Sequence, residues 1–185
     1  MGKSTTAQMF ADAGCEVWDA DAAVHRLYAK GGKAVHEIAQ VFPTAIVKDA
    51  VDRQALRDLI SNDVTVLKKL ETIVHPLVRR DREIFAVQST ADVLVFDIPL
   101  LFETRAENEM DAVICVSVSP ELQEKRVVER GTMTRDQFVA IRDKQMRNDE
   151  KCARSDFVIT TETLEDTRRQ VHDILEQIRG IEINA

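Results

Sequence analysis

Hydrophobic residues along this 185-residue chain occur in short unbroken runs separated by longer amphipathic stretches. Short apolar runs rich in β-branched residues, without strict alternation, favour a parallel sheet covered by helices on both faces. Such sheets bind ligands at the carboxyl ends of their strands. The runs that we interpret as strands end near residues 18, 96, 118 and 160 and comprise Cys15–Trp18, Val93–Phe96, Ala112–Val118 and Phe157–Ile159.

The amphipathic stretches predict the helices. The first covers Thr5–Ala13, with Gly14 as its C-terminal cap, and residues 22–88 are almost wholly helical in pattern. The last helix carries an apolar stripe and ends at Gly180. The stripe consists of Val171, Ile174, Leu175 and Ile178.

Capping residues and breaks locate the helix ends within these stretches. Breaks are predicted at Gly31-Gly32 and Phe42-Pro43-Thr44. Pro76 suits a first helical turn, and Thr134 with Gln137 forms a capping box. The remaining predicted starts are Asp52, Asn62-Asp63, Ser119-Pro120 and Thr163–Asp166.

Composition and charge narrow the class of protein. The 32 acidic residues outnumber the 25 basic ones, so the net charge of −7 argues against nucleic-acid and membrane-surface binding. The charge balance reverses between Lys125 and Arg154, with nine basic against five acidic residues. No apolar run reaches membrane-spanning length, and the start lacks a signal-peptide pattern. The widely spaced Cys15, Cys115 and Cys152 predict reduced thiols in a cytoplasmic protein, without a disulfide or metal role.

The start of the chain carries a phosphate-binding signal. Gly2-Lys3-Ser4-Thr5, followed by a helical pattern, matches the second half of the loop GxxxxGK[ST]. In that loop, backbone N–H groups hold phosphates, the lysine reaches the outer phosphates, and the hydroxyl binds Mg²⁺. The first glycine of the loop and the strand that should lead into it are absent from this sequence, so we expect about ten further residues upstream.

Carboxylates follow two of the predicted strands and are expected to converge on this loop. Asp97 ends the Val93–Phe96 run and is a candidate Mg²⁺ ligand together with Ser4. Asp19 and Asp21 are both candidates for the base at an acceptor hydroxyl. Asp21 is favoured because it lies further beyond the strand, and one of the two is expected to be only an N-cap.

Two further groups of basic residues are candidates for phosphate contacts. His75 and Arg79, four residues apart, share a helix face, and Arg79 could bind an acceptor phosphate. The two arginine-rich helices around Gly131 are typical of a lid that closes over phosphates. Spacing alone does not identify the arginine at the transferred group, and Arg130 and Arg142 rank first.

With these motifs in place, the chain resembles dephospho-coenzyme A kinase, of the P-loop kinase group. The resemblance covers residues 2–159 and rests on several ordered segments, each of which is weak alone. They are Gly2-Lys3-Ser4-Thr5, Asp19-Ala20-Asp21, His75-Pro76-Leu77-Val78-Arg79, Asp97-Ile98-Pro99-Leu100-Leu101-Phe102-Glu103, Gln145-Met146 with Glu150-Lys151, and Ser155-Asp156-Phe157-Val158-Ile159. Thr160-Thr161-Glu162 departs from the family's usual Asp-Asn at that place.

The resemblance implies transfer of the ATP γ-phosphoryl group to the ribose 3′-hydroxyl of dephospho-CoA, with Mg²⁺. It implies an α/β fold of the P-loop type, three-layered, with a five-stranded parallel sheet. Residues 1–185 would form one kinase domain, with an acceptor-binding helical insertion at about 22–90 and a lid at about 122–154. The assembly expected is a monomer or a weak homo-oligomer. Asp21 would be the base, with Asp19, His75, Arg79, Pro99, Leu100 and Leu101 on the acceptor side.

Two other functions remain open from the sequence. One is a P-loop kinase acting on a nucleoside monophosphate or another small alcohol. The other is a non-catalytic nucleotide-binding protein, suggested by the incomplete loop. The Asp19-Ala20-Asp21 and Pro99–Glu103 segments favour dephospho-CoA as the acceptor.

Overall fold

A computed structural model describes residues 2–129, 131, 134–142 and 145–182, and the chain divides into two compact units. The first unit comprises residues 1–17 and 99–185, and the second comprises residues 18–98. In the part of the chain that the structure describes, no helix combines the length and apolar character of a membrane span.

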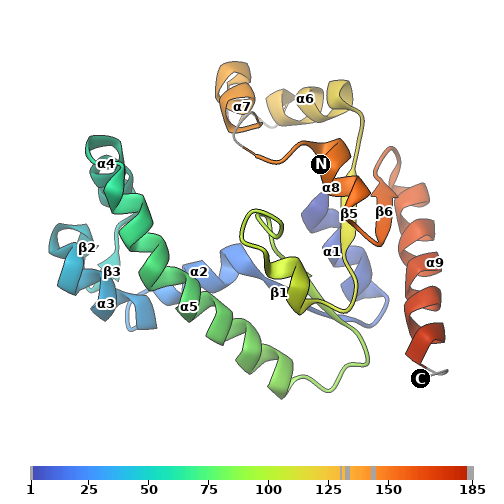
Figure 1. Ribbon diagram of the computed structural model, residues 1–185, viewed down its shortest axis with the longest axis horizontal. Coiled ribbons are helices and arrows are strands. Elements are labelled where there is room, and N and C mark those ends of the chain that lie inside the picture. Colours follow the sequence, from blue (N-terminus) through green and yellow to red (C-terminus); the bar gives the residue numbers. More distant parts are fainter. Residues whose placement is uncertain (1, 130, 132–133, 143–144, 183–185) are drawn as a thin grey trace. The chain divides into compact units, whose positions relative to one another are not determined.

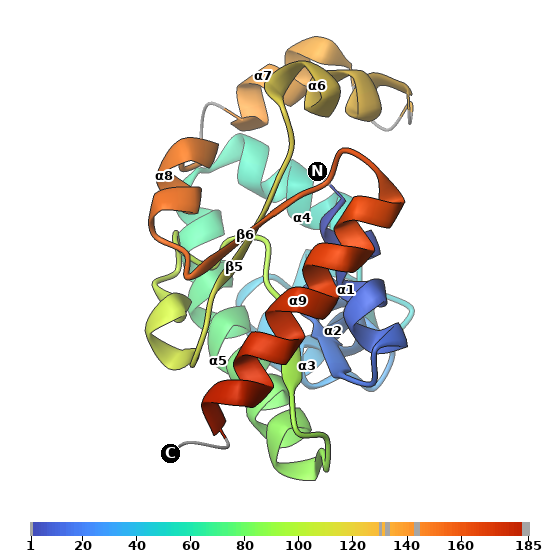
Figure 2. The ribbon, with the colours of Figure 1, turned by 90° about the vertical axis from the view of Figure 1, so that its right-hand side faces the viewer.

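The first unit is built around a pair of parallel strands. β5 (Ile114–Ser117) pairs with β6 (Phe157–Thr160), with Ile114 opposite Phe157 and Ser117 opposite Thr160. Helices pack on this pair, and Figure 2 shows α1 and α9 side by side next to it. The helices of this unit are α1 (Lys3–Asp12), η2 (Ala106–Glu109), α6 (Pro120–Glu129), α7 (Arg135–Arg142), α8 (Asn148–Ala153) and α9 (Leu164–Glu182).

The apolar stripe predicted for the last helix is the buried face of α9, a helix that packs against β6 and α1. Val171, Ile174 and Leu175 are buried and Ile178 is half-buried, while Ile159 on β6 is fully enclosed. Burying such side chains stabilises the packed arrangement by about 1.5–3 kcal/mol each. The predicted end at Gly180 is wrong, because α9 continues to Glu182. Glycine lowers helix propensity by only about 1 kcal/mol, which does not stop a helix that packs along one face.

The second unit is mainly helical, as its sequence pattern predicts. β1 (Glu16–Asp19), which begins in the first unit, and β4 (Leu94–Asp97) are hydrogen-bonded neighbours. A short antiparallel ribbon of β2 (Ile46–Val47) and β3 (Ala50–Val51) was not predicted. The helices are α2 (Ala20–Tyr28), α3 (Lys33–Val41), η1 (Pro43–Ala45), α4 (Arg53–Asn62) and α5 (Thr65–Gln88), and Figure 1 shows α5 as the long green helix.

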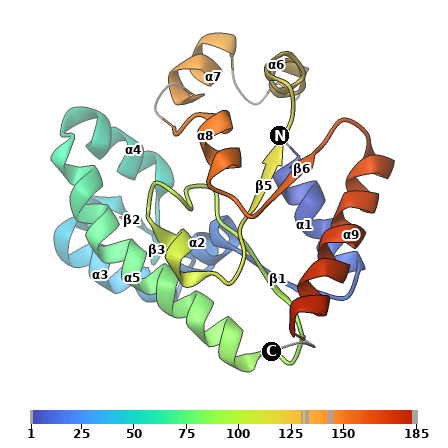
Figure 3. The same ribbon diagram turned by 45° about the vertical axis from the view of Figure 1, so that its right-hand side comes forward.

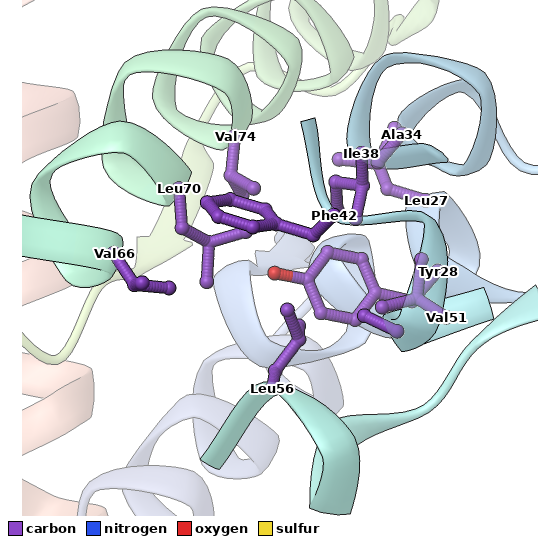
Figure 4. Packing of buried hydrophobic residues seen from close by; sticks show 11 residues of the cluster. Leu27, Tyr28, Ala34, Ile38, Phe42, Val51, Leu56, Val66, Leu70 and Val74 are labelled. Atoms are coloured by element: carbon purple, nitrogen blue, oxygen red, sulfur yellow. The ribbon is translucent and has the colours of Figure 1, made fainter. Parts of the chain in front are cut away.

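The core of the second unit lies between these helices, as Figure 4 shows. Tyr28, Ile38 and Phe42 face Leu70 and Val74 across it. The remaining members of the cluster are Leu27, Ala34, Ala45, Val51, Leu56 and Val66. Since all of them lie within residues 27–74, this unit has a hydrophobic core of its own.

Of three predicted helix starts in this unit, one is confirmed and two are wrong. Asn62-Asp63 ends α4 instead, and Val64 is the N-cap of α5. Pro76 lies inside the 24-residue α5 rather than in a first turn. The buried face of α5, with Val66, Leu70 and Val74, precedes Pro76 and offsets the cost of the lost backbone hydrogen bond. Asp52 is the N-cap of α4, where its carboxylate accepts hydrogen bonds from the backbone N–H groups of Gln54 and Ala55.

The four strands predicted from the apolar runs are all present, as β1, β4, β5 and β6. The mixed α/β class with parallel pairing is therefore confirmed. The two-residue strands β2 and β3 escaped prediction because they are too short to show a hydrophobic period.

Candidate functional site

The N-terminal turn of α1 has the backbone geometry of an anion-binding site. Gly2 adopts a left-handed conformation with φ of 92°, and its carbonyl accepts hydrogen bonds from the Thr6 N–H at 2.8 Å and the Thr6 hydroxyl at 3.1 Å. A Cβ at position 2 would lie 3.3 Å from Thr161 Oγ1, so both φ and space favour glycine. Ser4 and Thr5 are exposed in the first turn, where backbone N–H groups lack intrahelical partners.

A pocket of about 280 Å³ opens beside this turn, within the first unit. Its volume is close to the lower end of the range for small-ligand sites. The lining combines hydroxyl groups with one guanidinium and one leucine, a surface that suits a small polar ring system. It consists of Gly2, Thr5, Thr6, Arg126, Thr161, Thr163, Leu164 and Thr167.

Arg126 on α6 holds the loop that forms the far wall of this pocket. Its guanidinium donates to the Thr161 carbonyl at 2.7 Å and to the Glu162 carbonyl at 3.0 Å. The Thr161 backbone N–H and hydroxyl both donate to the Ser117 carbonyl at the end of β5, at 2.9 and 3.1 Å. The loop is thus fixed from two sides, which gives the pocket a defined wall before any ligand binds.

In the second unit, Asp19 and Asp21 have different environments. Asp19 is the N-cap of α2, and its carboxylate accepts a hydrogen bond from the Ala22 N–H at 2.6 Å. Asp21 lies in the first turn of α2, and its side chain is exposed. The prediction that one of the two is an N-cap is confirmed, and the residue is Asp19.

Asp97 ends β4 and is only 5% exposed, as a strand-terminal residue covered by neighbouring chain. Carboxylate and hydroxyl oxygens are the ligands that Mg²⁺ prefers, so the donor chemistry of Asp97 and Ser4 fits this ion. Among the described residues there is no cluster of three or more His, Cys, Asp or Glu side chains arranged to hold a metal. Mg²⁺ does not require one, because it commonly keeps several waters and binds through one or two protein oxygens together with phosphates.

His75 and Arg79 lie on the exposed surface of α5, and their predicted common face is confirmed. Arg79 forms an exposed ion pair with Glu83 at 3.3 Å. Asp81, also on α5, accepts hydrogen bonds from Trp18 Nε1 at 2.8 Å and from Arg26 at 2.6 Å. This contact connects α5 to the end of β1 and to α2 within the second unit.

The Pro99–Glu103 segment returns to the first unit and is anchored by its last two residues. Pro99 and Leu100 are exposed and Leu101 is half-buried. Phe102 is buried, with the Arg154 guanidinium 4.8 Å from its ring centre. Glu103 accepts from Lys151 Nζ at 2.9 Å and from the Met146 N–H at 3.2 Å. The segment is therefore fastened to α8 and to the chain that leads into it.

The carboxyl of Glu103 is stabilised in its charged form. Partial burial raises its pKa, but the hydrogen bonds from Lys151 and from backbone N–H groups outweigh this effect. The pKa consequently lies below its ordinary value of 4.5.

The arginine-rich helices α6 and α7 lie side by side in Figure 3. The predicted capping box is confirmed, because the Thr134 N–H donates to the Gln137 side chain and the Gln137 N–H donates to Thr134 Oγ1. Arg135 on α7 pairs with Glu124 on α6 at 2.5 Å. Of the two candidate lid residues, Arg130 and the side chain of Arg142 lie outside the described residues.

Comparison with known proteins decides between the functions left open by the sequence. The family model described as "Dephospho-CoA kinase" matches residues 1–166. The chain belongs to the dephospho-CoA kinase family. A dephospho-CoA kinase of Ruegeria pomeroyi is 62% identical over 185 residues, covering 100% of this chain and 94% of the relative. One of Cereibacter sphaeroides is 51% identical over 179 residues, covering 97% and 91%.

Solved structures agree with this assignment. The crystal structure of TT1252 from Thermus thermophilus has a TM-score of 0.84 at 31% identity, covering 95% of this chain and 91% of that one. Dephospho-CoA kinase from Campylobacter jejuni has a TM-score of 0.68 at 26% identity, covering 96% and 91%. The fold is that of a P-loop kinase, and the reaction is the ATP-dependent phosphorylation of dephospho-CoA, with ATP and Mg²⁺ as cofactors.

Within this dephospho-CoA kinase family member, two groups of site residues were not identified from the sequence. Arg126 was grouped with the lid, whereas its guanidinium shapes the pocket beside Gly2. Glu103 was recognised only as part of a motif, and its partners Lys151 and Met146 are more than 40 residues away. Both partners belong to the quoted segment Gln145-Met146 with Glu150-Lys151, but the sequence did not indicate the contact, because a contact between distant residues leaves no periodic pattern.

The Glu103 contact leads to a prediction about stability. Glu103→Gln should lower the free energy of unfolding at pH 7 by roughly 1–2 kcal/mol, since a charge-assisted hydrogen bond is lost. A carboxyl whose pKa is lowered on folding stabilises above its unfolded pKa and loses that contribution as the pH falls through the folded value. The difference between wild type and variant should therefore shrink below pH 4.5. Urea unfolding at pH 7 and in acid measures it.

The exposed Glu71→Gln exchange on α5 serves as the matched control and should leave the unfolding free energy within about 0.5 kcal/mol. Combining Glu103→Gln with Lys151→Met should cost less than the two single changes added together, because both remove the same ion pair. Strict additivity would contradict the assigned contact.

Proposed function

We propose that this chain carries out the kinase reaction with Lys3 and Ser4 at the ATP phosphates and Asp21 at the acceptor hydroxyl. The observation that supports this most strongly is the N-terminal turn of α1, with left-handed Gly2 and exposed Ser4 next to a pocket of about 280 Å³. A helix N-terminus of this kind attracts phosphate through oriented N–H groups and the helix dipole.

Gly2, Lys3, Ser4 and Thr5 bind the ATP phosphates in this proposal. The backbone N–H groups of the turn bind phosphate oxygens, and the ammonium group of Lys3 offsets negative charge on the transferred phosphoryl group. Ser4 and Asp97 supply oxygen ligands for Mg²⁺. When bound, the ion neutralises charge on the β- and γ-phosphates. The pocket walled by Thr161 and Arg126 holds the base and sugar of ATP.

Asp21 acts as the base in this proposal. The acceptor oxygen must lose a proton as it bonds to phosphorus, and a carboxylate within hydrogen-bond reach takes that proton. Asp21 suits the role because its side chain is exposed, while a carboxylate oxygen of Asp19 is already engaged in capping α2. Asp19 retains a second oxygen for the acceptor.

The remaining residues bind the acceptor or exclude water. Arg79 holds an anionic group of dephospho-CoA through its planar donors, with His75 one turn away on the same face of α5. Pro99, Leu100 and Leu101 provide the apolar contact with the acceptor. Arg130 and Arg142 cover the transferred phosphoryl group as part of the lid.

The proposal also assigns roles to parts of the chain, a cellular compartment and a state of assembly. Residues 22–90 bind the acceptor, residues 122–154 act as the lid, and the whole chain works as one kinase domain. The helical core within residues 27–74 supports the first assignment, since it gives the acceptor-binding part a framework of its own. We place the enzyme in the cytoplasm, as a monomer or a weak homo-oligomer.

The roles of Lys3 and Asp21 are distinguished by comparing turnover with ATP binding. Asp21→Asn should lower kcat by about 10²–10⁴-fold and leave the Kd for ATP within about twofold, because the base acts on the acceptor in the transition state. Lys3→Ala should lower kcat by about 10²–10³-fold and also weaken ATP binding. Coupled ADP release gives the rates, and calorimetric titration gives the affinity.

Asp49→Asn and Lys68→Ala are matched controls on exposed positions of the second unit, and both should keep near-normal kcat. If Asp21→Asn weakened ATP binding as much as it slowed turnover, Asp21 would not be the acceptor base. A near-normal rate for Lys3→Ala would remove the phosphate-loop assignment.

The pocket assignment is tested at Arg126. Arg126→Gln removes the charged donors that hold the Thr161 and Glu162 carbonyls, so the KM for ATP should rise about tenfold. The KM for dephospho-CoA should stay within about twofold. Steady-state kinetics with each substrate varied in turn measures both, and the neighbouring Lys125→Gln exchange is the control. An unchanged KM for ATP would show that the nucleotide binds elsewhere.

A further inference from the structure

Two of the three cysteines, which are far apart in the sequence, lie against each other in the first unit. Cys152 Sγ on α8 donates a hydrogen bond to Cys115 Sγ on β5, and the sulfur atoms are 3.3 Å apart. A disulfide bond is about 2.05 Å long. A small adjustment of the two side chains would therefore bring the sulfur atoms to bonding distance. All three cysteines are reduced in the structure.

The two sulfur atoms differ in accessibility. Cys115 is buried at 7% exposure, whereas Cys152 is only half-buried and is the one that solvent reaches. Burial, followed by the hydrogen bond and charge of Cys152, raises the pKa of Cys115 to about 12. Cys115 therefore keeps its proton at neutral pH, and Cys152 is the sulfur that meets an oxidant first.

Neighbouring side chains fix the position of α8, and with it the position of Cys152. Asn148, one turn before Cys152 on the same helix, donates to Ser117 Oγ on β5 at 2.8 Å and approaches Cys152 Sγ at 3.8 Å. The neighbouring Lys151 is paired with Glu103. These contacts keep the two thiols facing each other without a covalent bond.

We propose that Cys115 and Cys152 form an oxidation site, at which hydrogen peroxide joins the two sulfurs in a disulfide and ties α8 covalently to β5. The inference goes beyond the proposed function and does not depend on it. It also replaces the expectation that these thiols have no disulfide chemistry.

The reaction balances with peroxide as the only oxidant. Cys152 first releases its thiol proton, its thiolate attacks one peroxide oxygen, the O–O bond breaks, and a sulfenic acid and hydroxide form. The hydroxide takes up the released proton and becomes the first water. The Cys115 sulfur then attacks the sulfenic sulfur, an S–S bond forms, and the S–O bond breaks. The departing oxygen leaves as water with the Cys115 proton. In total, two thiols are oxidised to a disulfide and one peroxide is reduced to two waters.

The experiment treats the reduced full chain with a small excess of hydrogen peroxide and maps peptides without reductant. We expect one peptide pair linking Cys115 to Cys152, with the loss of two hydrogens, that separates again with dithiothreitol. Because the bond closes a loop of several tens of residues, the Tm of the oxidised chain should rise by roughly 5–10 °C. Both effects should be absent in Cys152→Ser and in Cys115→Ser, and both should persist in Cys15→Ala.

Cys152→Ser keeps the test valid if the buried Cys115→Ser exchange impairs folding, since Cys152 is half-buried. Recovery of only sulfenic or higher acids at Cys152, of disulfide-linked dimers, or of no linked peptide would overturn the proposal. A linked peptide without a rise in Tm would contradict the part of the proposal that the bond forms within the undisturbed fold.

Discussion

The parallel pairing of β5 with β6 is the interaction on which the first unit depends. Its register sets Ser117 opposite Thr160, so the next residue, Thr161, donates twice to the Ser117 carbonyl and reaches the Gly2 turn. From the same strand β5, Ser117 accepts from Asn148 on α8 and Cys115 accepts from Cys152. One strand pair thus positions both the pocket wall and α8, and Ile159 at its centre is completely buried. A slip of one residue would turn these side chains to opposite faces.

In the second unit, packed helices position the candidate site residues. Its helices enclose an apolar core, and Asp81 joins Trp18 and Arg26 so that α2 and α5 are held together. Trp18 and Phe85 each pack edge-on against Phe96 of β4. The candidate base Asp21 and the candidate acceptor contact Arg79 therefore stand on two helices of one packed unit, α2 and α5. Exposed side chains on a rigid framework of this kind can change with little effect on stability, which allows kinetics to test their roles.

The sequence predicted those features that arise from local patterns. All four longer strands, the Asp52 cap and the Thr134 capping box follow from short-range hydrophobic periodicity or hydrogen bonding, and each is present. Pro76 and Gly180 were misjudged because tertiary packing of α5 and α9 outweighs the local cost of proline and glycine. The phosphate turn and the acidic strand ends were recognisable because their chemistry is encoded in adjacent residues. The contacts of Glu103 with Lys151 and of Cys115 with Cys152 join residues that are far apart in the sequence, so only the folded structure reveals them.

The central claim is that this chain moves the γ-phosphoryl group of ATP to one hydroxyl of dephospho-CoA. The most direct measurement incubates the purified chain with Mg²⁺, ATP and an acceptor panel of dephospho-CoA and nucleoside monophosphates, followed by ³¹P NMR of the products. The account predicts one ADP for each new phosphomonoester on the ribose 3′-oxygen of dephospho-CoA, with little transfer to the other acceptors. ADP formation without that ester, or faster phosphorylation of a nucleoside monophosphate, would contradict it.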